Sequence, residues 1–150
     1  MKKLAIVVLL VVVGGCTRKV VTGSPQVAAN APGGVTPRDA LQRFMTAAKQ
    51  QDLQAMAMVW GDARGPAQAT MDQGERDQRE VVMMCFLKHD SYQILGDAPA
   101  ANNDRVFAVE LRYKALTKSS NFITTRGPSE RWYVKEVKDM EALREICAAR

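Results

Sequence analysis

The spacing of apolar residues changes once along this chain, near residue 90, and this change limits the fold more than any other feature. Before it, apolar residues recur at steps of three and four, which is the period of an amphipathic helix. The first such series is Leu41, Phe44, Met45 and Ala48. After it, apolar and polar residues alternate, as in 105–113, which is the period of a strand. Helices followed by antiparallel strands indicate an α+β domain.

The first half of this region predicts three helices. Thr36 with Pro37 is typical of a helix start, and the first helix is expected to end at residues 50–51. Asp52 is expected to cap a short second helix that ends at Gly61. A loop with one helical turn is expected at 62–74. A third helix is expected at 75–88, with residues 75–80 in solvent and one broad apolar side. That side comprises Val81, Val82, Met84, Cys85 and Phe86.

The second half predicts about four strands and a last helix. Strands are expected at 91–95, 105–113, 121–125 and 131–137, with turns at 97–103 and 126–129. A C-terminal helix is expected to begin at Asp139. The predicted fold is therefore α+β, with N-terminal helices packed on a bent antiparallel sheet and a helix at the end.

The N-terminus has the three regions of a secretory signal peptide. Two lysines precede an apolar run at 4–13, and small residues lead to Cys16. This pattern resembles the signal of bacterial lipoproteins, in which the cysteine is acylated and becomes the mature N-terminus. An ordinary signal peptide or a membrane anchor is the alternative, but a spanning helix needs about 20 apolar residues. The resemblance implies a signal at 1–15 and a lipid on Cys16.

The lipoprotein signal also implies a location. In enteric bacteria, an aspartate directly after the lipidated cysteine favours retention in the inner membrane. The residue at this position is Thr17, which implies the outer membrane, with the protein facing the periplasm. In a host with one membrane, the outer face of the cytoplasmic membrane is the alternative. Residues 16–35 are rich in Gly, Pro, Ala and Ser and predict a flexible tether, which leaves 36–150 as one domain.

The charge of the mature chain is too small to indicate a nucleic acid partner. The 21 basic residues of the whole chain include Lys2 and Lys3, so removal of 1–15 leaves 19 against 16 acids and a formal charge of +3. The last strands carry both signs of charge, which is typical of a solvated sheet face. We therefore expect no nucleic acid partner. Contact with the membrane is expected to occur through the lipid on the cysteine.

The domain resembles the NTF2-like superfamily in the order of its elements. The opening residues 36–41, Phe44, 47–48 and 51–53 are similar to the first two helices of these domains. The segment 130–134 is similar to the last strand of their small lipoprotein members. The resemblance implies a cone, in which a bent sheet wraps around the helices and leaves a cavity at the open end. That cavity is an enzyme site in some members and a binding or packed space in others.

Large aromatic residues are candidates for lining such a cavity, with plain core packing as the alternative. The loop at 62–74 is a candidate lid, and its arginine is the candidate contact for an acidic ligand. The pocket candidates are Trp60, Arg64, Tyr92, Tyr113 and Trp132.

Few residues suggest chemistry. His89 is the one histidine, and its place at a helix end favours capping or solvent exposure over catalysis with Asp90. Cys85 and Cys147 are expected to form a disulfide, with two buried thiols or a reactive cysteine as alternatives. The sequence predicts no catalytic set, no metal site and no cofactor.

Three functions remain open at this point. The first is a non-enzymatic binding module for a partner protein or a small apolar ligand. The second is a structural or assembly subunit that meets its neighbour through the sheet face of Glu110 and Arg112. The third is an enzyme of the dehydratase or isomerase type. The oligomeric state does not follow from the sequence.

Overall fold

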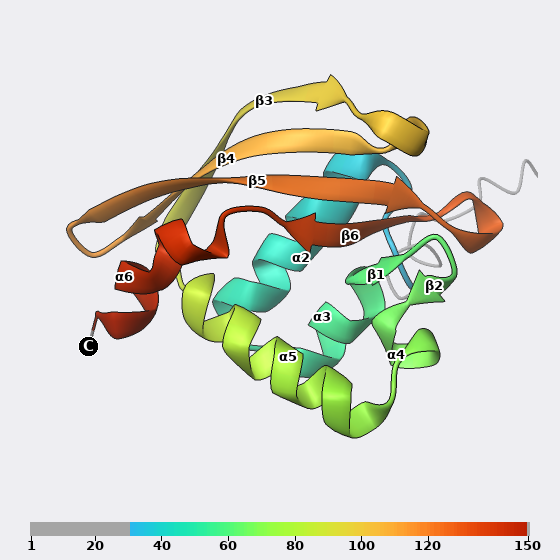
Figure 1. Ribbon diagram of the computed structural model, residues 1–150, viewed down its shortest axis with the longest axis horizontal. Helices are drawn as coiled ribbons and strands as arrows, with labels where there is room; N and C mark the ends of the chain where they lie inside the picture. The colour runs from blue at the N-terminus through green and yellow to red at the C-terminus, as the bar shows by residue number, and fades with distance from the viewer. Residues whose placement is uncertain (1–30, 150) are drawn as a thin grey trace, which may run out of the picture.

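The computed structural model describes residues 31–149, so the expected signal at 1–15, Cys16 and Thr17 lie outside the described residues. It confirms the predicted α+β class. Helix α2 lies between the sheet and helices α3 and α5, and α6 lies at one end of the sheet (Figure 1). The helices are α2 (Pro37–Gln50), α3 (Leu53–Val59), α4 (Ala67–Thr70), α5 (Gln73–Phe86) and α6 (Arg144–Ala148). The main strands are β3 (Ser91–Pro99), β4 (Arg105–Tyr113), β5 (Leu116–Arg126) and β6 (Trp132–Val137).

The first two helices begin where their capping residues predict. The Asp39 amide donates to Thr36 Oγ1 at 3.0 Å, and Pro37 occupies the first helical turn. The Ala55 amide donates to Asp52 Oδ1 at 2.9 Å at the start of α3. These local signals need no tertiary contact, so the sequence alone could locate them.

The four strands form one antiparallel sheet in the order β3-β4-β5-β6. Its register shifts between Ile94 and Gly96 and between Ile123 and Thr124, and such irregularities bend a sheet. Two strands are longer than predicted: β3 continues to Pro99, and β5 already begins at Leu116.

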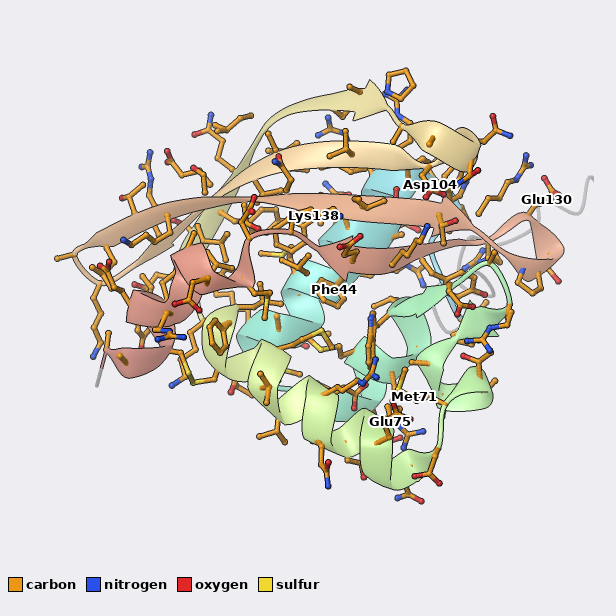
Figure 2. All side chains as sticks on the ribbon, viewed as in Figure 1. Phe44, Met71, Glu75, Asp104, Glu130 and Lys138 are labelled. Carbon is orange, nitrogen blue, oxygen red and sulfur yellow. A yellow bond between two sulfur atoms is a disulfide. The ribbon has the colours of Figure 1, made fainter. Side chains whose placement is uncertain are left out.

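The core lies between α2 and the concave face of the sheet. Its largest fully buried side chains include Phe44, Phe107 and Phe122, and Phe44 meets Phe122 edge-on with ring centroids 6.3 Å apart. Figure 2 shows Phe44 in the interior, between the sheet and the helices below it. Burial of such aromatic side chains contributes about 1.5–3 kcal/mol each.

The loop expected at 62–74 is largely structured. Strand β1 (Gly61–Asp62) pairs with β2 (Gly65–Pro66) in a small hairpin, and α4 follows directly. Trp60 forms a parallel bridge with Val134, which joins this segment to β6. The sequence missed the hairpin because two-residue strands carry no periodicity.

The end of the expected tether packs against the domain. Gly34 exchanges two backbone hydrogen bonds with Trp132, at 2.7 and 2.9 Å. The Arg131 guanidinium donates to the carbonyl oxygens of Pro32 at 2.9 Å and Gly33 at 2.8 Å. A Cβ on Gly34 would lie 2.2 Å from the Ala40 nitrogen, so glycine permits this close approach. Ordered contacts therefore begin before residue 36.

The predicted disulfide is confirmed. Cys85 near the end of α5 is bonded to Cys147 of α6, with their Cα atoms 4.8 Å apart and a sequence separation of 62 residues. The C-terminal helix, which begins as a 3-10 turn at Met140–Leu143, is thereby tied to α5. Within residues 31–149, no helix has the length and apolar character needed to cross a bilayer.

Candidate functional site

The five pocket candidates lie in separate parts of the domain. Trp60 is buried and lines a hollow of about 380 Å³ beside Val82 and Met83 of α5. Arg64 is exposed on the β1–β2 hairpin, where its guanidinium donates to Asp62 at 2.6 Å and lowers the pKa of that carboxyl. Arg64 is therefore held by a surface ion pair and does not face Trp60 across a shared cavity.

Tyr92 and Tyr113 both lie close to His89. Tyr92 packs edge-on against His89, with ring centroids 5.5 Å apart. Tyr113 lines a shallow hollow of about 400 Å³ together with Lys49 and His89. Trp132 lies at the opposite end of the sheet, so the aromatic candidates do not form one wall.

His89, for which capping or solvent exposure was expected, is buried, with 6% of its surface exposed. Its Nδ1 lies 2.8 Å from the carbonyl oxygen of Leu87, the C-cap residue that follows α5, which agrees with a capping role. Burial lowers the pKa of His89. Asp90 points elsewhere, since its carboxylate accepts the Lys114 amide at 2.7 Å. His89 and Asp90 therefore have different partners.

A buried ion pair on α5 was missed by the sequence interpretation. Glu80 is 1% exposed, and its Oε2 lies 4.0 Å from Nε of Arg76. Burial raises the pKa of Glu80 to about 7, and the opposing effect of Arg76 is smaller. Met84 and Leu87, which are buried, follow Glu80 by four and seven residues. Residues at this spacing share one face of a helix, so the sequence could have indicated that Glu80 is buried.

Because Glu80 and Met84 face the core, the side of α5 that was expected to be buried is partly wrong. Val81 and Val82 are exposed, at 58% and 53%, instead of facing the core. They were assigned to the core because they are apolar. The helix turns Glu80 and Met84 inward, and 81 and 82 consequently face outward.

One hollow is a groove between α2 and α3, which we call the α2–α3 groove. Its volume is about 540 Å³, within the range of small-molecule sites. Mostly apolar residues form its walls, with a few polar ones on α2. The lining residues are Ala31, Ala55, Met58 and Val59 with Gln42, Arg43 and Thr46. Arg43 Nε donates to Asp39 at 3.3 Å and Nη1 to the Ala31 carbonyl at 3.2 Å, which holds one rim in place.

A second hollow lies at the N-terminal end of α2, and we call it the sheet-end cleft. It has a volume of about 340 Å³ between α2 and the ends of β3, β4 and β6. Its lining residues are Thr36, Pro37, Arg38, Asp97, Arg105, Phe107 and Trp132. Of the five predicted pocket residues, Trp132 belongs to this cleft. No local motif marks it, because its residues are brought together only by the sheet.

Comparison with protein families, curated proteins and solved structures found no match for this chain.

Proposed function

We propose that this chain is an envelope lipoprotein whose NTF2-like domain binds a small apolar molecule in the α2–α3 groove and catalyses no reaction. The observation that carries the proposal is the groove itself, about 540 Å³ in volume with apolar walls. The bent four-stranded sheet over α2 supports the NTF2-like part of the proposal.

The walls of the groove suit an apolar guest. Met58 supplies a flexible, polarisable surface, and Ala55 leaves space beside it. Burial of apolar ligand surface contributes about 25 cal/mol per Å² before the costs of association. Gln42 and Thr46 provide polar groups at the edge that can orient one polar atom of the ligand.

The position of the groove favours a molecule taken from the membrane. Ala31, which lines the groove, is 15 residues after Cys16. A chain of this length spans at most about 50 Å, so a lipid on Cys16 would keep the groove within that distance of the bilayer. A lipid-like apolar molecule is the ligand class most concentrated there.

Native mass spectrometry of the protein extracted from its host in mild detergent tests the ligand. We expect an added mass of small-molecule size that is lost on denaturation. Ala55→Trp should remove it, because the indole fills the groove, whereas Ala148→Trp on the exposed end of α6 should keep it. A bare wild-type protein, or an adduct that survives Ala55→Trp, would contradict the proposal.

A separate experiment tests the anchor. Labelled fatty acid should be incorporated into the wild type and absent from Cys16→Ser, because the thiol is the acylated group. Fractionation should then recover the labelled protein with the outer membrane. Equal labelling of both proteins would refute the lipoprotein assignment without affecting the groove.

The assembly function remains a second candidate, but the observation that favours it lies on α5 and not on the expected sheet face of Glu110 and Arg112. Val81 and Val82 are exposed, and Val82 lines the hollow that contains Trp60. Exposed apolar residues around a concave surface are typical of protein contacts. If this face binds a subunit, the native mass should include a second protein, and Val82→Glu should remove it while leaving any small-molecule adduct. A mass equal to that of the lipidated monomer would argue against this candidate.

A further inference from the structure

The sheet-end cleft combines an aromatic floor with two arginines. Phe107 is almost fully buried and forms the floor, and Trp132 forms one side. The Arg38 guanidinium lies 6.0 Å from the centre of the Phe107 ring, within the range of a cation–π contact. A flat surface and oriented guanidinium groups are thus present together.

One carboxylate serves both arginines. Arg105 Nη2 donates to Asp97 Oδ2, and Arg38 Nη2 lies 3.7 Å from the other oxygen, Oδ1. The cleft therefore carries two positive charges and one negative charge. Asp97 fixes the guanidinium groups but balances only one of them.

The charged groups of the cleft are accessible from solvent. The side chains of Arg38, Arg105 and Asp97 are 52%, 35% and 29% exposed. A guanidinium has five N–H donors in a planar fork, so each arginine can bind a second carboxylate while it keeps Asp97. The excess of one positive charge matches a monoanion better than a dianion.

From these observations we infer that the sheet-end cleft is a second binding site, for a small monocarboxylate with a flat apolar body. The carboxylate binds Arg38 and Arg105, and the flat body lies against Trp132, which is partly exposed, whereas Phe107 supports Arg38 from below. This site shares no lining residue with the α2–α3 groove. Its existence does not depend on the proposed function.

Isothermal titration calorimetry of the full-length protein with benzoate tests the site. Benzamide, which has the same shape without the charge, is the matched ligand control, and inorganic phosphate tests for a general anion site. We expect benzoate to bind, and its affinity should fall as salt is added. Its affinity should be at least about tenfold higher than that of benzamide, since hydrogen bonds to charged groups are stronger than neutral ones.

Substitutions locate the binding. Arg38→Gln and Arg105→Gln should each lower the affinity for benzoate about 10- to 100-fold, because each substitution removes hydrogen-bond donors and the excess positive charge. Arg112→Gln on the same strand as Arg105 is the control, since it also loses an ion pair, to Glu110, but lies outside the cleft. Arg105→Lys keeps the charge and should weaken binding less than Arg105→Gln.

Several results would overturn the inference. They are no heat of binding with benzoate, equal affinity for benzamide or phosphate, and equal effects of Arg105→Gln and Arg112→Gln. Loss of benzoate binding in Ala55→Trp would assign the ligand to the α2–α3 groove instead. Circular dichroism of each variant tests whether it is folded. If Arg105→Gln does not fold, the benzoate affinity of Arg105→Lys is compared with that of Arg112→Gln instead.

Discussion

The helix α5 and the sheet-end cleft both contain acid–arginine pairs, but the two regions bury them differently. In α5, Glu80 is fully buried beside Arg76, and the helix continues to the disulfide at Cys85. In the cleft, Asp97 and Arg105 are partly open to solvent. Buried charges affect folding through their pKa values, whereas exposed ones are available to a ligand. Changes in α5 should therefore alter stability, and changes in the cleft should alter binding.

The largest effect on stability should come from the disulfide. Replacement of Cys85 and Cys147 by serine opens a loop with a sequence separation of 62 residues. The expected loss is about 2–4 kcal/mol in the free energy of unfolding, measured by urea titration. Benzoate affinity should stay unchanged under native conditions. Unchanged stability would show that α6 is held by packing alone.

Glu80→Gln should give the next largest effect, and it should depend on pH. The pKa of Glu80 is raised from 4.5 to about 7, so between these values the folded state binds a proton that the unfolded state releases. Wild-type stability should therefore fall as pH rises through this window. The stability of Glu80→Gln relative to wild type should increase by about 2 kcal/mol from pH 5 to pH 8.

Chemical denaturation at several pH values measures this difference. Arg79→Gln is the control, because its partner Glu75 is an exposed residue on the same helix (Figure 2). A constant difference between Glu80→Gln and wild type would mean that Glu80 is ionised in the folded protein throughout.

His89 should give a smaller effect with the opposite sign. Burial lowers its pKa, so the folded state takes up a proton less readily than the unfolded state. Its contribution to stability is present above the ordinary pKa of 6.5 and is lost as pH falls through the lowered value. His89→Gln should reduce the acid sensitivity of unfolding below pH 6.5. Titration of the His89 ring by NMR at or above its ordinary pKa would contradict this prediction.

The smallest effect on stability is expected in the cleft. Arg105→Gln breaks a partly exposed ion pair with Asp97, which contributes about 0–1 kcal/mol. The variant should unfold close to wild type although it binds benzoate weakly. A loss as large as that of the disulfide variant would mean that this pair supports the sheet, and the contrast between the two regions would disappear.

The parts of the fold that follow from local signals could be predicted. Thr36 and Asp52 cap α2 and α3, and alternation placed β4 at residues 105–113. The first half of β5 was missed because residues 116–120 contain one large apolar residue, Leu116. Pairing with β4, which no single-segment pattern encodes, extends this strand.

The candidate sites follow from tertiary structure and were harder to predict. Trp132 was named because it is aromatic, but its neighbours Arg38 and Asp97 are far away in sequence. The α2–α3 groove was not expected at all, since it is the space left between two helices that each bury another face. The cysteine pair was predictable because two cysteines remain once Cys16 is assigned to the lipid.

The proposed function requires that the α2–α3 groove holds an apolar molecule. The most direct test is a crystal structure of the protein purified in mild detergent with whatever molecule it retains. We expect elongated apolar density between α2 and α3, in contact with Met58 and Val59. A retained molecule located elsewhere, or a groove filled by side chains with no bound molecule, would contradict it.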